Sequence, residues 1–150
     1  KSGGKLWSCN LAVRKDFFQK LKGFDEDLRY FEDVDFHIRA QKQNARITFT
    51  QEAQVVHPWR KAISLEKVKL RRACRIAVAK KHPNILKTYR FGYIFAPLLR
   101  LYRDLVSDFW LHRLRGMRLR LLHFLEEQKG AMEIMRLKYL AAGKEIGVIC

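Results

Sequence analysis

The sequence predicts an α/β unit over residues 1–60, followed by an all-α helical extension over residues 61–150. Two observations support this division. Residues 6–13 are mostly apolar and residues 46–56 alternate between apolar and polar side chains, as buried and half-buried strands do, with helical segments between them. From residue 64 onward, apolar residues recur instead with the period of an α-helix.

Most of the positive charge lies in the predicted extension. The 150 residues carry a formal net charge of +16. Residues 60–123 hold seventeen basic and three acidic groups and account for +14 of it, whereas residues 1–59 contribute +2. A basic field of this size favours an anionic partner, which can be a membrane surface, a nucleic acid or a phosphorylated substrate.

The predicted N-terminal unit contains two helices between its extended segments. Asp16 is a plausible N-cap for a short helix over residues 17–21, and Gly23 suits the left-handed position after its last turn. A second helix is expected from Glu32 to about Gln43, with Asn44 as its stop. Residues 46–56 then form one extended stretch or two short strands.

The predicted extension consists of helices separated by clear breaks. Ser64 is expected to cap a helix that runs to about Lys81, where a His-Pro-Asn sequence interrupts it. Pro97 fits the first position of the next helix, and Gly116 separates that helix from a last one over residues 117–142. No run of about 18 apolar residues occurs, so no transmembrane helix is expected. Three cysteines without metal-binding spacing indicate free thiols in a reducing compartment.

An acidic cluster interrupts this otherwise basic chain. Residues 25–35 contain six acidic side chains in eleven positions. One interpretation is structural, because carboxylates in the first turn of a helix are stabilised by the helix dipole. The other is catalytic, because a carboxylate fixed at a helix N-terminus can act as a general base towards a substrate hydroxyl. The pattern alone does not decide between the two.

Four segments in order resemble one enzyme family. A Ser-Cys-Asn sequence with a following basic pair lies at residues 8–15, and a Gly-Phe-Asp-Glu turn at residues 23–26. A Glu-Asp helix start lies at residues 32–36, and a strand ending in His at residues 55–57. Together they resemble the acceptor-side part of inverting, family-two glycosyltransferases of the GT-A fold. Lys22 and Phe31 depart from the family pattern, which has smaller residues at these positions.

The resemblance implies roles for individual residues. Asp33 would take the proton from an acceptor hydroxyl, and Glu32 would bind or orient that acceptor. Asn10 lies in the matching strand and would bind the acceptor. Trp7 and Trp59 could stack on sugar rings of the acceptor, although core packing is the more common role for either tryptophan alone. His57 could ligate a divalent metal.

The resemblance also implies substrates and a cofactor. The donor would be a nucleotide-diphosphate sugar, and the acceptor a glycan or lipid-linked saccharide. Mg²⁺ or Mn²⁺ would be bound mostly by a preceding half of the fold. The chain begins inside the family pattern, so we expect a C-terminal part of a longer enzyme that is inactive on its own.

The basic extension predicts peripheral attachment to an anionic membrane, on the cytoplasmic face of the cell membrane. Arg-rich amphipathic helices with interleaved aromatic residues lie in membrane interfaces. The alternative is a nucleic-acid-binding or membrane-adaptor helical module without catalysis, although no specific nucleic-acid motif is present. The residues expected to contact the membrane are Arg100, Arg103, Trp110, Arg113, Arg115, Arg118 and Arg120.

Overall fold

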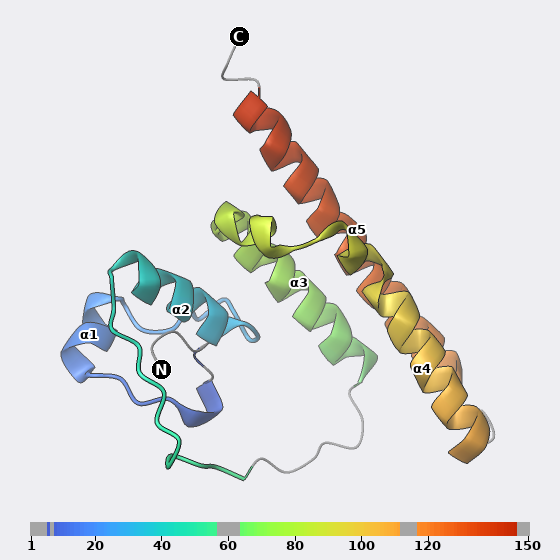
Figure 1. The fold of residues 1–150 in the computed structure, drawn as a ribbon, viewed down its shortest axis with the longest axis horizontal. Helices are drawn as coiled ribbons and strands as arrows, with labels where there is room; N and C mark the ends of the chain where they lie inside the picture. The colour runs from blue at the N-terminus through green and yellow to red at the C-terminus, as the bar shows by residue number, and fades with distance from the viewer. Residues whose placement is uncertain (1–5, 7, 57–63, 112–116, 147–150) are drawn as a thin grey trace. The chain divides into compact units, whose positions relative to one another are not determined.

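The computed structural model describes residue 6 and residues 8–56, 64–111 and 117–146, with the backbone alone for residues 107–111 and 144–146. The chain divides into two compact units, Lys1–Ala62 and Ile63–Cys150. Figure 1 shows the helices of each unit, coloured from blue at the N-terminus to red at the C-terminus.

The regular elements of the described residues are helical, so the predicted α/β class is wrong. Residues 6–13 contain the short 3-10 helix η1 (Ser8–Asn10) instead of a strand. Residues 46–56 run as a loop in which Thr48 makes an isolated β-bridge. A strand needs a neighbouring strand for its backbone hydrogen bonds. Among the described residues no second strand pairs with residues 46–56, and Val56 remains 98% exposed.

Three phenylalanines form the core of the N-terminal unit. Phe18 lies in α1 (Lys15–Lys20), Phe36 in α2 (Glu32–Lys42) and Phe24 in the loop between them. Their ring centroids lie 5.3–5.5 Å apart, in tilted and edge-to-face arrangements that aromatic pairs favour. Phe36 is only 1% exposed. The buried residues of α2 are Asp35, Phe36 and Ala40.

The end of α1 differs from its prediction by one position. The amide of Gly23 donates to Phe18 O and the amide of Lys22 donates to Gln19 O, both at 2.9 Å, which defines a Schellman cap. Lys22, rather than Gly23, is thus the first left-handed residue after the helix, at φ 62°. Gly23 follows with φ 65°, so two consecutive residues are left-handed.

Of the two other predicted helix boundaries of this unit, the one at Asn44 is confirmed and the one at Asp16 is wrong. Asn44 has φ 52° and follows the last turn of α2, as predicted for its stop. Asp16 is not the N-cap of α1, because Arg14 holds that position and Asp16 lies in the first turn. Arg14 donates two hydrogen bonds to Asp16, and these lower the pKa of that exposed carboxyl.

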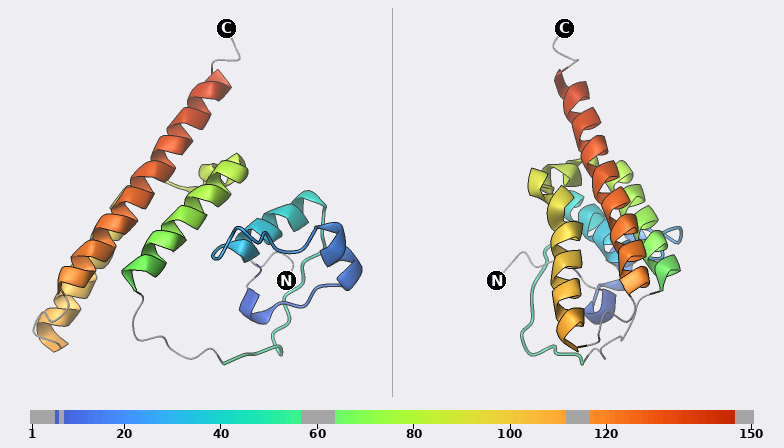
Figure 2. Two further views of the ribbon diagram at one scale, coloured as in Figure 1. Left: turned by 180° about the vertical axis from the view of Figure 1, so that it is seen from behind. Right: turned by 90° about the vertical axis from the view of Figure 1, so that its right-hand side faces the viewer.

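The C-terminal unit is built around one long helix. It comprises α3 (Leu65–Lys81), the 3-10 helices η2 (Pro83–Thr88) and η3 (Phe91–Phe95), α4 (Ala96–Leu111) and α5 (Met117–Ile146). Helix α5 packs against both α3 and α4, which Figure 2 shows from two directions. The predicted cap is confirmed, because the Ser64 side chain accepts a hydrogen bond from the Lys67 amide. Pro97 is the second residue of α4 rather than the first.

The core of this unit lies where α3, α5 and the two 3-10 helices meet. Ile134 of α5 is fully buried and packs with Ala79 of α3 and Leu86 of η2. Tyr89 and Tyr93 stack edge to face against this cluster, with ring centroids 4.6 Å apart. Burial raises the pKa of the Tyr89 phenol. These contacts anchor the connection between α3 and α4 to the long helix.

A partly desolvated ion pair joins α3 to α5. The carboxylate of Glu126 lies 3.2 Å from the guanidinium of Arg72 and 3.2 Å from the ammonium of Lys129. Burial raises the pKa of Glu126, but the Lys129 hydrogen bond and the Arg72 charge outweigh burial and leave the pKa below its ordinary value. At Gly130 an added Cβ would lie 3.0 Å from Arg72 Cγ, so the Arg72 stem packs closely on α5.

None of the described helices combines the length and the apolar character needed to cross a lipid bilayer.

We predict that Gly23→Ala destabilises the N-terminal unit. The φ of 65° is unfavourable for alanine by about 1–2 kcal/mol. The new Cβ would also lie 3.2 Å from the ring of Phe18. Amide hydrogen exchange in α2 should therefore accelerate. The matched control is Gly143→Ala in α5, where an added Cβ meets nothing within 4 Å and alanine should slow exchange. Unchanged exchange in α2 of Gly23→Ala would contradict the assigned turn.

We predict that the Glu126 pair makes the C-terminal unit acid-sensitive. Because the folded pKa lies below the ordinary value of 4.5, the stabilisation is fully present above pH 4.5 and is lost as the pH falls through the folded pKa. Glu126→Gln should lower the melting temperature at neutral pH and flatten its dependence on pH below 4.5. Circular dichroism melts from neutral to acidic pH measure both effects. The exposed Glu66→Gln should keep the parent pH profile.

Candidate active site

The guanidinium of Arg39 organises the N-terminal unit. Its Nε lies 2.7 Å from the carboxylate of Asp35, one turn earlier in α2, and this carboxylate is completely buried. The remaining nitrogens donate to the carbonyl oxygens of Leu21 and Gly23, the latter at 2.7 Å. Arg39 also lies over the ring of Phe36, 5.4 Å from its centroid. The planar, multidentate guanidinium thus fixes α2 against the end of α1.

The first turn of α2 holds the two candidate catalytic carboxylates. Phe31, immediately before the helix, is left-handed with φ 64°, and the helix begins at Glu32. Asp33 Oδ1 accepts a hydrogen bond from the Val34 amide at 2.8 Å. Glu32 and Asp33 are both partly exposed, whereas Asp35 and Phe36, which follow them in α2, are buried.

Ser8 connects η1 to both carboxylates. Its hydroxyl donates to Glu32 Oε1 at 3.1 Å, and its amide donates to Asp33 Oδ2 at 3.3 Å. The structure therefore brings together two segments that lie 24 and 25 residues apart in the sequence. A carboxylate held from both sides in this way has a defined orientation, which a general base requires.

Asn10 attaches η1 to the loop of residues 46–56. Its side-chain amide donates to the Ala53 carbonyl oxygen at 2.7 Å. Asn10 also lines an open groove of about 750 Å³ between residues 10–20 and the loop. Phe36 and Ala40 of α2 reach this groove, whereas Glu32 and Asp33 do not line it. The candidate base therefore does not line this groove.

Several predicted site residues cannot be placed. Trp7, His57 and Trp59 lie outside the described residues, and so do Arg113 and Arg115. For Trp110 the structure gives the backbone alone. Their predicted roles in acceptor, metal and membrane binding therefore stay predictions.

Metal ligation is not supported by the residues that the structure places. In the described segments no group of three or more His, Cys, Asp or Glu side chains could hold a metal ion. Asp33 and Asp35 do not act as a pair, because Asp35 is buried against Arg39 while Asp33 is partly exposed. The divalent metal that the resemblance implies, bound mostly by a preceding half of the fold, therefore stays a prediction.

Three of the four predicted membrane-binding arginines that can be placed form ion pairs within the unit. Arg100 pairs with Glu127 of α5 at 2.6 Å, and Arg103 pairs with Asp104 at 2.9 Å. Arg120 lies 3.7 Å from the same Asp104. Arg118, on α5, is exposed. Two of these pairs connect α4 with α5, so the arginines have a structural role that the sequence pattern did not reveal.

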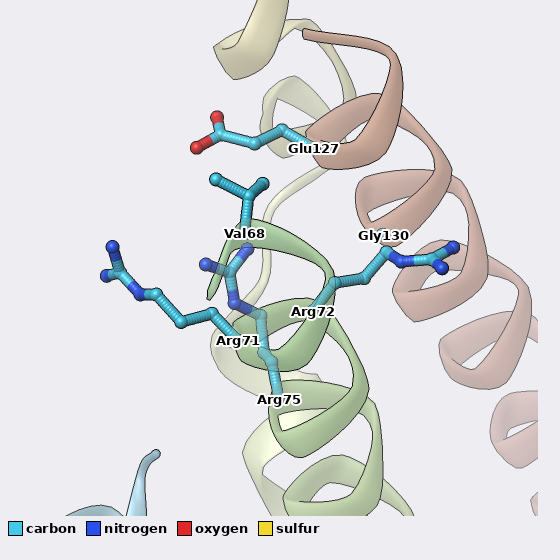
Figure 3. A pocket seen from close by; sticks show the side chains of 6 residues that line it. All are labelled: Val68, Arg71, Arg72, Arg75, Glu127 and Gly130. Carbon is cyan, nitrogen blue, oxygen red and sulfur yellow. The ribbon is translucent and has the colours of Figure 1, made fainter. Parts of the chain in front are cut away.

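Helix α3 carries a further group of arginines at its contact with α5 (Figure 3). Arg72 extends towards Gly130, whereas Arg71 points away from α5. The space between these arginines, Val68 and Glu127 has a volume of about 20 Å³. A cavity of this size holds about one water molecule, so it is a packing feature of the helix pair rather than a ligand pocket.

No protein-family model, curated protein or solved structure matches this chain.

The sequence pattern did not reveal the contacts of Ser8 or the burial of Asp35. Ser8 belongs to the Ser-Cys-Asn sequence of the resemblance, but nothing in that sequence indicates that it bonds to Glu32 and Asp33. The i, i+4 spacing of Asp35 and Arg39 is typical of an ordinary surface pair. This spacing is a valid signal for the pair, but it carries no information about burial.

We predict that Arg39→Met destabilises the N-terminal unit by on the order of 3 kcal/mol, because the buried Asp35 carboxylate would lose its cation. Urea unfolding followed by hydrogen exchange in α2 measures the loss. Arg14→Met is the matched control: it removes a pair whose side chains are 84% and 67% exposed, and it should cost less than about 1 kcal/mol. Equal losses in the two variants would show that Arg39 is not the organising contact.

Proposed function

We propose that the N-terminal unit carries the acceptor-side part of an inverting glycosyltransferase. The enzyme would transfer a sugar from a nucleotide-diphosphate sugar to a hydroxyl of a glycan or lipid-linked saccharide. The observation that carries the proposal is the pair of carboxylates at the N-terminus of α2, oriented by Ser8 from one side and by the Val34 amide from the other. The ordered resemblance of residues 8–57 to family-two enzymes supports it.

In this proposal Asp33 is the general base. The acceptor oxygen attacks the anomeric carbon as the bond from that carbon to the diphosphate oxygen breaks, and the nucleoside diphosphate leaves with the bonding electrons. The acceptor proton passes to the Asp33 carboxylate. Attack from the face opposite the leaving group inverts the anomeric configuration. Asp33 keeps the lone pairs needed for this role, because each of its oxygens accepts only one of the hydrogen bonds described above.

Glu32 is assigned to acceptor binding. Its Oε1 accepts a hydrogen bond from the Ser8 hydroxyl, which supports the assignment of this carboxylate to hydroxyl binding. A sugar acceptor presents hydroxyls of the same chemistry, and a carboxylate binds such groups by charge-assisted hydrogen bonds. Its neighbour Asp33 would then lie within reach of the adjacent acceptor hydroxyl.

We predict that Asp33→Asn lowers turnover by roughly 10²–10⁴-fold, the usual contribution of a general base. The test is release of nucleoside diphosphate by the full-length polypeptide, assayed with a panel of nucleotide sugars and acceptors. Donor binding should change little, because asparagine preserves the hydrogen bond from the Ser8 amide. Asp27→Asn, which alters an exposed carboxylate in the preceding loop, is the matched control and should retain parent turnover. Full activity of Asp33→Asn would remove Asp33 from the mechanism.

A further inference from the structure

One face of η3 and α4 is an unbroken apolar stripe. Its six side chains recur every three or four residues along one side of the segment and are 43–71% exposed. The stripe residues are Phe91, Phe95, Leu98, Leu99, Tyr102 and Val106. Phe91 and Phe95 contact each other edge to face at 6.0 Å, which continues the stripe across the junction between the two elements.

The stripe is not the packing face of α4. Pro97 is buried and Leu101 and Leu105 are partly buried, while Arg100 reaches across to Glu127 of α5. The face of α4 towards α5 is thus already packed against that helix. The stripe offers a second apolar face that nothing covers among the side chains that the structure describes.

We propose that the stripe is the surface by which this protein lies on an anionic membrane, independently of whether the N-terminal unit transfers sugars. Exposed arginines border it: Arg90 lies between η2 and η3, and Arg103 is 73% exposed beside Tyr102. Asp104, an acidic residue of α4, is paired with Arg103 and Arg120. An apolar face with a cationic border complements the acyl boundary and anionic headgroups of a bilayer.

Charge also favours a lipid surface over a second copy of the chain. The excess of +14 over residues 60–123 would oppose the approach of two such faces, whereas an anionic leaflet attracts them. Because Arg100, Arg103 and Arg120 already form ion pairs within the unit, we assign most of the binding free energy to the apolar side chains. The arginines then provide the preference for anionic lipid.

The test is co-sedimentation of the full chain with vesicles of phosphatidylcholine, with and without phosphatidylglycerol. The triple variant Leu98→Gln, Leu99→Gln, Tyr102→Gln should lower the partition coefficient about tenfold or more, because it removes three membrane-contacting side chains. Met132→Gln is the matched control: this α5 side chain is 56% exposed but lines the groove between α3 and α5, and the change should leave partitioning unchanged. Raising the salt concentration should weaken binding to anionic vesicles without abolishing it.

A second variant tests the stripe without the risk that the triple substitution disturbs folding. Tyr102→Trp keeps the stripe intact and should bind at least as well as the parent, because tryptophan prefers the headgroup region. The proposal is overturned if the triple variant, with parent helicity by circular dichroism, partitions as the parent does. It is equally overturned if the parent binds duplex DNA but no vesicles, or if the triple substitution abolishes a concentration-dependent dimer while vesicle binding is absent throughout.

Discussion

The buried contact between Arg39 and Asp35 is the interaction on which the N-terminal unit depends. A completely buried carboxylate is costly unless its charge is compensated, and Arg39 supplies that compensation within one helical turn. The same guanidinium satisfies two carbonyl oxygens in the turn that follows α1. These carbonyl oxygens belong to the residues on either side of Lys22, whose φ is positive. The guanidinium therefore stabilises this strained turn and at the same time holds α2 against it.

The C-terminal unit packs helices that are long and rich in cationic side chains. Close packing of such helices brings positive charges together, and these charges repel one another unless they are compensated. Glu126 and Glu127 are adjacent on α5 and each accepts an arginine from a different helix, Arg72 from α3 and Arg100 from α4. Two neighbouring carboxylates therefore connect three helices. The small residue Gly130, one turn later, allows the Arg72 stem to lie against α5.

Local signals in the sequence predicted helices well and the sheet badly. Ser64 and Asn44 marked helix boundaries correctly because capping depends on a few neighbouring atoms. Residues 46–56 have the alternation of a strand, but strand formation depends on a partner, which the alternation does not supply. At the end of α1, glycine preference pointed to Gly23, whereas hydrogen bonding placed Lys22 first.

The candidate site was predictable only in part. The Glu32-Asp33 start of α2 could be located from its charge and its place before an apolar helix. The role of Ser8 could not be predicted, because it depends on a contact across 24 residues. The same limit applies to the stripe on α4: its period was visible in the sequence, but two apolar faces of one helix are distinguished only when a neighbour covers one of them.

The hydrogen bond from Ser8 to Glu32 has a consequence for the acceptor binding proposed above. The Glu32 carboxylate already accepts an internal hydroxyl, so a sugar bound to this oxygen would replace one hydroxyl by another of similar strength. The net gain from that contact would therefore be small. Under the proposal, affinity would come from the rest of the acceptor, and selectivity would follow the shape and apolar surface of the ligand more than the number of its hydroxyl groups.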